Sequence, residues 1–97
     1  MNYVEEIRQE LKKHIKVNDR LLNLYALLVL TKGKNVTFKD VHDAWALDQN
    51  KVFPEHWSIV PFNQLKHEVM MKDKKYVDVI KKVAIKFNKG GSNEQKN

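Results

Sequence analysis

A ten-residue, almost wholly apolar run from Leu21 to Leu30 constrains the fold of this chain more than any other feature. A helix that is apolar on all sides is usually the buried centre of its domain. The run is far shorter than the ~20 residues that a membrane-spanning helix needs. We therefore expect a central helix over residues 19–32, capped by Asn18 or Asp19 and stopped by Gly33, and no contact with a membrane.

The segments on either side show the spacing of amphipathic helices that pack on such a centre. After an Asn2 cap, apolar residues recur at helical spacing to about residue 17. Thr37 and Asp40 have the spacing of a capping box, which predicts a helix over residues 37–49. Pro61 precedes a short helical segment over 62–71, and Asp73 is expected to cap a last helix. The apolar stripe of that helix is Tyr76, Val77, Ile80, Val83, Ala84 and Phe87.

These patterns predict an all-α fold with no convincing strand. The chain has 97 residues, which is the size of one domain with one modest core. We expect a bundle of four to five helices over residues 1–88. Residues 89–97 are polar and contain Gly90 and Gly91, so we predict a disordered tail there.

Residue types argue against an enzyme or a metal protein. Without cysteine there is no disulfide, thiolate nucleophile or Cys-based zinc site. The four histidines lack paired metal-ligand spacing, Ser58 near His56 is no triad signal, and no Gly-rich phosphate loop precedes a helix. We expect no catalysis, no cofactor and no metal. The acidic N-terminus lacks an apolar signal segment, so we expect a cytoplasmic protein.

The net charge of +6 is concentrated near the C-terminal end, where residues 74–97 carry seven lysines against two acids. A basic surface attracts phosphates, but a lysine-rich solvated helix is the commoner explanation. Nucleic-acid recognition favours arginine, and only Arg8 and Arg20 are present. We therefore do not expect a nucleic-acid partner.

Residues 40–62 hold both tryptophans and two of the four histidines, a combination typical of a pocket for a flat, polar ligand. His42 and Trp45 are three residues apart and share a helix face. At such a position Trp45 is more often a core anchor. His42 either binds ligand or caps the following loop. Trp57 lies outside any apolar stripe and is the best candidate for an exposed stacking platform. Ser58 either binds ligand or makes a local turn bond, and Tyr76 is a core residue with its hydroxyl at a rim.

Two motifs in this region resemble the RyR repeat domain, which also occurs as free-standing bacterial and phage proteins. The first is Val41-His42-Asp43-Ala44-Trp45, and the second runs from His56 through Val60-Pro61-Phe62 to Leu65. Glu68, Asp73 and Tyr76 continue the pattern, so the likeness covers about residues 36–85. The loop between Trp45 and His56 is shorter than in that family and lacks its Gly-Trp-x-Tyr-Gly element, and Trp57 replaces a proline. Short phage and actinobacterial proteins with Val-His-x-Ala-Trp and Val-Pro-Phe are more similar still.

The resemblance implies a small helical domain that recognises a nucleotide-derived signal. We expect non-catalytic binding of such a small molecule, for example a phage protein that counters host defence by sequestering an immune signalling nucleotide such as an ADP-ribose derivative. The alternatives are a nucleic-acid-binding domain and a protein–protein adaptor, including a homo-oligomer paired through the first helix. The predicted ligand-binding residues are His42, Trp45, His56, Trp57, Ser58 and Tyr76.

Overall fold

The computed structural model describes residues 2–95, with side chains described as far as residue 88. Five α-helices follow one another, and within residues 2–95 there is no strand, so the predicted all-α class is confirmed. The helices are α1 (Tyr3–Lys12), α2 (Asp19–Thr31), α3 (Phe38–Val52), α4 (His67–Met70) and α5 (Lys74–Gln95). Three 3-10 turns join them, η1 (Gly33–Asn35), η2 (Phe62–Gln64) and η3 (Met71–Asp73).

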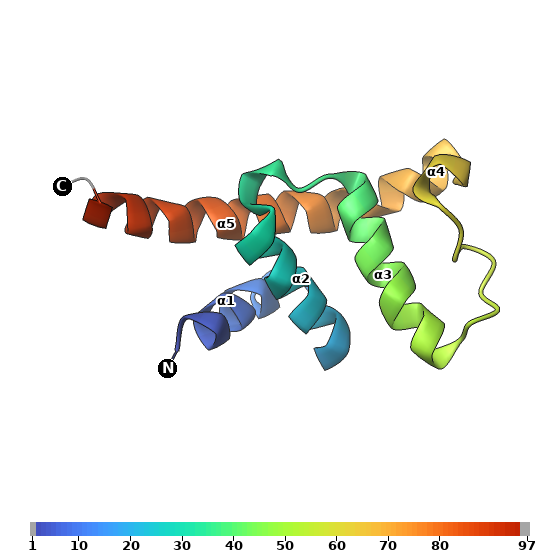
Figure 1. Cartoon of the computed structure of the whole chain (residues 1–97), viewed down its shortest axis with the longest axis horizontal. Coiled ribbons are helices and arrows are strands. Elements are labelled where there is room, and N and C mark those ends of the chain that lie inside the picture. Colours follow the sequence, from blue (N-terminus) through green and yellow to red (C-terminus); the bar gives the residue numbers. More distant parts are fainter. Residues whose placement is uncertain (1, 96–97) are drawn as a thin grey trace.

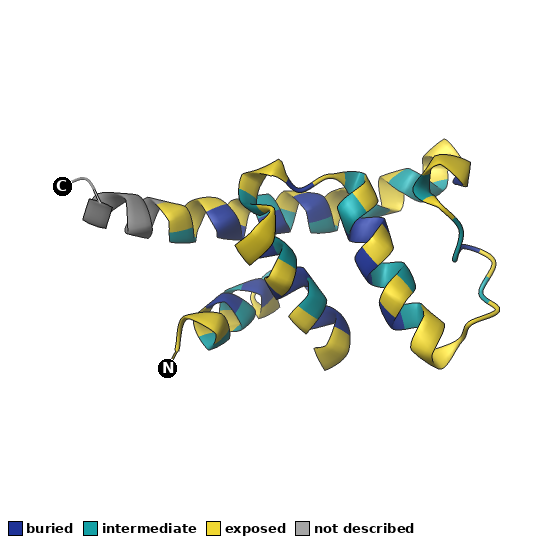
Figure 2. Cartoon of the chain, viewed as in Figure 1, coloured by how far each residue is buried: buried dark blue, intermediate teal, exposed yellow. Residues whose placement is uncertain are grey.

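The long helix α5 forms one edge of the molecule, and α1, α2 and α3 lie along one side of it (Figure 1). Helix α2 contacts α1, α3 and α5, so it occupies the centre of the bundle as predicted. Its buried residues meet those of the other three helices in one core (Figure 2). The side chains of Leu11, Leu22, Tyr25, Val41 and Ile80 are at most 1% exposed. Each such side chain stabilises the fold by about 1.5–3 kcal/mol.

Burial of α2 is nevertheless incomplete. Leu27 is 51% exposed and Leu30 is 46% exposed, so the expectation of a helix buried on all sides is wrong for its outer face. Helices α1, α3 and α5 cover three sides of α2, and the fourth side, which carries Leu27 and Leu30, is exposed to solvent.

Local capping signals set the beginnings of three helices, as the sequence predicts. The side chains of Asn2 and Asn18 accept hydrogen bonds from the backbone of Glu5 and Leu21. Thr37 and Asp40 form a reciprocal capping box at the start of α3. Helix α2 ends one residue before Lys32, and the following Gly33 adopts a φ of 58°, the left-handed conformation that glycine tolerates best.

The predicted helix ends are less accurate. Helix α1 ends at Lys12 rather than near residue 17, although Ile15 beyond it is still buried. Helix α3 continues to Val52, three residues past the predicted end. Helix α5 is continuous in its backbone to Gln95, past the predicted helix end at residue 88, and the predicted disorder of residues 89–97 stays a prediction. Paired glycines weaken a helix by about 1 kcal/mol each rather than forbid it, and residues 96–97 lie outside the described residues.

The segment before α5 is broken into three pieces instead of the single helical segment predicted over 62–71. η2 is followed by α4, and η3 then runs directly into α5 with helical backbone at Lys74. Asp73 is therefore inside a continuous helical turn and does not cap α5, contrary to the sequence prediction. Among the described residues, no helix combines the length and apolarity needed to cross a bilayer.

Candidate functional site

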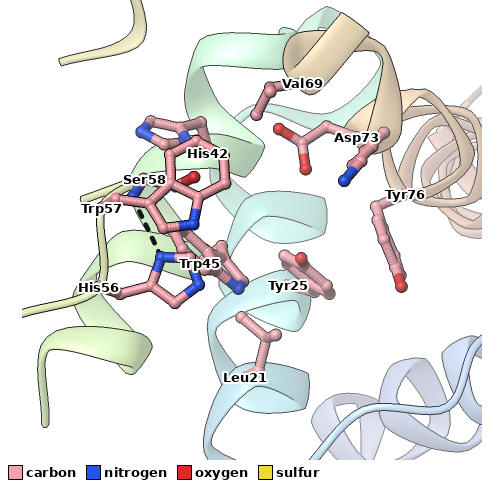
Figure 3. A pocket seen from close by; sticks show the side chains of 11 residues that line it. Leu21, Tyr25, His42, Trp45, His56, Trp57, Ser58, Val69, Asp73 and Tyr76 are labelled. Carbon is pink, nitrogen blue, oxygen red and sulfur yellow. Dashed lines mark hydrogen bonds between the residues drawn. The ribbon is translucent and has the colours of Figure 1, made fainter. Parts of the chain in front are cut away.

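A hollow of about 360 Å³ opens between α2, α3, the 53–61 loop and the start of α5. All six residues predicted from the sequence line it, namely His42, Trp45, His56, Trp57, Ser58 and Tyr76 (Figure 3). Sequence reasoning did not place five other lining residues at the site: Leu21, Tyr25, Val69, Lys72 and Asp73. The hollow falls within the 300–1,000 Å³ range of small-molecule sites.

His42 joins α3 to the loop that closes the hollow. Its side chain is only 3% exposed, and Nε2 lies 2.7 Å from the carbonyl oxygen of Val60. A carbonyl only accepts, so Nε2 carries the proton and donates. The sequence allows two interpretations of His42, as a ligand-binding residue or as a cap of the following loop. This bond supports the second interpretation. Its ring also lines the hollow, 5.8 Å from the Trp45 ring between centroids.

The loop residues His56, Trp57 and Ser58 form one compact turn. The backbone N–H of Ser58 donates to Nδ1 of His56 at 3.0 Å, so the neutral His56 ring is protonated at Nε2. The ring of Trp57 stacks on His56 with 5.6 Å between centroids and an interplanar angle of 27°. Ser58 is buried, and its backbone rather than its hydroxyl makes the turn bond, which corrects the alternative considered from the sequence.

Trp45 and Trp57 differ in burial although both line the hollow. Trp45 is half-buried and packs against the core, as a core anchor does, and its indole meets His56 edge to face at 5.1 Å. Trp57 is 69% exposed, so a large apolar surface lies at the rim in contact with solvent. The rim therefore offers an indole face that the fold itself does not use.

The far side of the hollow is formed by two tyrosines. Tyr25 of α2 is 1% exposed, and its ring lies 5.6 Å from that of Tyr76 of α5. Burial, and more weakly the nearby Asp73, raise the pKa of the Tyr25 phenol well above its ordinary value. Tyr76 is half-buried and packs on the core, in line with its predicted position at the edge of an apolar stripe.

Asp73 supplies the acidic group of the site, although the sequence predicts a helix cap at this position. Its side chain is half-buried at the end of η3 and projects toward the hollow (Figure 3). Burial raises the pKa of this carboxyl, while the nearby His42 acts in the opposite direction. A carboxyl with a perturbed pKa in a concave site is a common feature of functional sites. Lys72 beside it is exposed and provides a positive charge on the same hollow.

A second hollow, of about 440 Å³, lies next to the first. Trp57 and Val69 line both, so they form the boundary between the two spaces. The second hollow is otherwise lined by residues of the 60–68 segment, including Leu65, Gln64 and Lys66. Gln64 and Lys66 are exposed, and Leu65 is buried.

The residues at the first hollow combine flat aromatic surfaces with a few polar groups at its edges. Such a lining can stack a planar ring and accept or donate a small number of hydrogen bonds. Among residues 2–88, whose side chains the structure describes, no three His, Asp or Glu side chains gather in a way that would hold a metal ion.

Residues 2–85 match the family described as "Domain of unknown function (DUF7701)", and the chain belongs to this family. The match covers all the helices that form the hollow, including the part of α5 that lines it. No curated protein and no solved structure matches the chain. The likeness to the RyR repeat domain stays a prediction.

Proposed function

We propose that this protein binds a nucleotide-derived small molecule, without chemically changing it, in the hollow between α2, α3, the 53–61 loop and α5. The main support is the gathering of two indoles and two imidazoles around one solvent-accessible space. Aromatic side chains that line an open hollow stack the bases of nucleotides, and each stacked base contributes ~1–3 kcal/mol. This proposal also draws on the RyR-like motifs, which supply His42, Trp45, His56 and Tyr76.

The size of the hollow limits how much of a nucleotide enters it. At about 360 Å³ it is near the lower end of small-molecule sites, which suits one base with its sugar better than a complete dinucleotide. Phosphates then lie at the rim, where Lys72 is exposed. The net charge of +6 favours the approach of such an anion.

The biological role we propose is sequestration of a signalling nucleotide such as an ADP-ribose derivative, as the resemblance to free-standing phage proteins suggests. Sequestration needs tight binding and no turnover, so an intact ligand should be recovered from the complex. Release of unchanged ADP-ribose after denaturing a complex would agree with this role, and recovery of a product would contradict it.

Trp57→Ala gives a direct test of the site. We expect adenosine or ADP-ribose to bind the variant about 5- to 150-fold more weakly than the parent, which corresponds to the ~1–3 kcal/mol of one stacked base. Leu47→Ala is a matched control, because Leu47 is a similarly exposed apolar residue (63%) that lines neither hollow. Titration calorimetry measures both, and equal affinity of all three proteins would contradict the proposed site.

A nucleic-acid partner is less consistent with the charges on α5. Two of its exposed lysines are in ion pairs, Lys74 with Asp78 at 2.8 Å and Lys86 with Glu10 at 3.0 Å. These pairs reduce the positive field along the helix that would otherwise attract phosphates. Filter binding at low salt distinguishes this alternative, because a nucleic-acid binder retains measurable affinity there.

Pairing of two copies through α1 also has limited support from the packing. Ile7 and Leu11, the main apolar residues of α1, are buried within their own domain, which leaves Tyr3 and Val4 exposed at its start. The larger exposed apolar surface is Leu27 and Leu30 on α2. Light scattering tests a homo-oligomer, and a monomeric mass at all concentrations would contradict it.

A further inference from the structure

Asp73 occupies the side of the hollow that faces the aromatic residues of the loop. Figure 3 shows Trp57, Trp45 and His56 on one side and Asp73 with Tyr25 and Tyr76 on the other. A ligand ring stacked on the indoles therefore directs its remaining polar groups toward this carboxyl. The acid comes from η3 and the tyrosines from α2 and α5, so three separate elements hold this arrangement.

The carboxylate of Asp73 has no hydrogen-bond or ion-pair partner among the side chains and backbone groups of the described residues, although it is half-buried. Every other buried or half-buried aspartate in that part of the chain has one. Asp40 closes the capping box with Thr37, and Asp48 accepts from Arg20 and Asn18. A partly desolvated carboxylate without a donor raises the free energy of the folded state. A ligand that supplies donors to this carboxylate recovers that free energy.

The charge of Asp73 also decides which part of a ligand it accepts. Phosphate oxygens would be repelled by the carboxylate, whereas neutral O–H and N–H groups donate to it. Two adjacent donors suit it best, because a carboxylate offers two oxygens in one plane. In a nucleotide, such a donor pair is either the cis-diol of the ribose or the neighbouring N–H groups on the edge of a guanine-type base.

We propose that Asp73 is the specificity-determining residue of this pocket and accepts a pair of neutral donors from the ligand stacked on the opposite aromatic wall. The inference rests on the proposed function and adds the orientation of the ligand. The ring lies against Trp57 and the donor pair lies at Asp73. The phosphate lies outward, near Lys72.

The test compares the parent with Asp73→Asn in titration calorimetry, with thermal unfolding used to confirm that both are folded. The asparagine keeps the shape of the side chain but loses the charge and one acceptor. We expect the variant to bind adenosine or guanosine about 10- to 150-fold more weakly, the usual effect of losing a hydrogen bond to a charged group. Asp78→Asn is the control, because Asp78 is exposed on α5 and lines neither hollow.

Matched ligands identify the donor pair. If the ribose is the source, the parent should prefer adenosine to 2′-deoxyadenosine and 3′-deoxyadenosine, and Asp73→Asn should lose that preference. If the base edge is the source, the parent should prefer guanosine to inosine, and the variant should again lose the preference. Either pattern supports the inference.

Two negative results have different meanings. If the parent binds these nucleosides or ADP-ribose but Asp73→Asn binds them equally well, the inference about Asp73 is wrong and the proposed function stands. If the parent binds none of them, both are wrong. Binding of choline in their place, dependent on Asp73, would assign the pocket to organic cations, which aromatic residues around an acid also attract.

Discussion

His42 and Val60 are 18 residues apart in the sequence and joined by a hydrogen bond of 2.7 Å from the imidazole Nε2 to the backbone carbonyl oxygen. The bond fixes the end of the 53–61 loop against the first turns of α3. The loop carries His56, Trp57 and Ser58, so the position of one wall of the hollow depends on this contact.

Replacing His42 by alanine should destabilise the protein and loosen this loop in particular. The loss of one buried hydrogen bond and of ring packing predicts a reduction of about 1–3 kcal/mol in the free energy of unfolding, measurable by urea denaturation. Amide hydrogen exchange should accelerate more over residues 55–60 than in α1. His42→Gln, whose amide retains a donor, should preserve part of the protection. A uniform acceleration in α1 and the loop would contradict the role of His42 as a loop anchor.

Asp48 forms a second long-range polar contact, between α3 and the start of α2. Its side chain is 3% exposed and lies 2.8 Å from Nε of Arg20, and Asn18 donates to it at 3.1 Å. A double-mutant cycle of Arg20→Ala and Asp48→Ala should give a coupling of about 1 kcal/mol, because the acid is buried while Arg20 is half-exposed. The exposed pair Lys39–Asp43 is the control, with an expected coupling of about 0.3–0.5 kcal/mol. Equal couplings would show that burial of Asp48 adds nothing.

The features predicted correctly from the sequence are those that depend on neighbouring residues. Caps at Asn2, Asn18 and Thr37 involve backbone groups three positions away, and the apolar stripe of α5 follows helical spacing. The gathering of the histidines and tryptophans was also predicted, because His42 and Trp45 share a helix face and the loop returns after a short distance.

The role of Asp73 could not be predicted in the same way. An aspartate just before an amphipathic stripe is typical of a helix cap, and the stripe here begins at Tyr76. Its actual role depends on η3 continuing into α5 without a break, which turns the side chain toward α2 and the hollow. The position of Tyr25 at the hollow could not be predicted for a similar reason. Local spacing shows that Tyr25 is buried, but it does not show that its ring borders a hollow lined by side chains between residues 42 and 76.

Glu10 should contribute to the loss of stability in acid. Hydrogen bonds from Lys86 and Lys13 lower the pKa of its carboxyl to about 2, from 4.5 in an unfolded chain. A carboxyl whose folded pKa is lowered stabilises the protein fully above the unfolded value, and this contribution disappears as the pH falls from 4.5 toward 2. Glu10→Gln should therefore lose less stability than the parent over this interval in urea denaturation.

Lysine variants check the origin of that effect. Lys86→Ala removes the hydrogen bond from α5 to Glu10 of α1, and it should flatten the same part of the pH profile. Lys82→Ala, an exposed lysine of α5 that does not contact Glu10, should leave the profile of the parent intact. If Glu10→Gln and the parent lose stability in parallel from pH 4.5 to 2, the Lys86 contact is not part of the acid response.

Asp73 should have the opposite effect on the pH dependence of stability. Burial raises the pKa of its carboxyl in the folded protein above the unfolded value of 3.8, and His42 opposes the change. The other titratable residues around the hollow are Tyr25, His56, Lys72 and Tyr76. The folded state then binds the proton more tightly than the unfolded state, so stability falls as the pH rises from below 3.8 through the folded pKa. At pH 7 the ionised carboxylate is a net cost to the fold.

Asp73→Asn removes that cost, so the variant should be more stable than the parent at pH 7 by less than about 1 kcal/mol, since the side chain is only half-buried. The difference should vanish below pH 3, where the parent carboxyl is protonated as well. Urea denaturation at both pH values measures it, with Asp78→Asn as the exposed control. A site that binds ligand often retains a residue that destabilises the free protein. A variant that is more stable at pH 7 and binds nucleosides more weakly would show that Asp73 serves ligand binding and not the fold. A variant that is less stable at pH 7 would show instead that the carboxylate supports the structure.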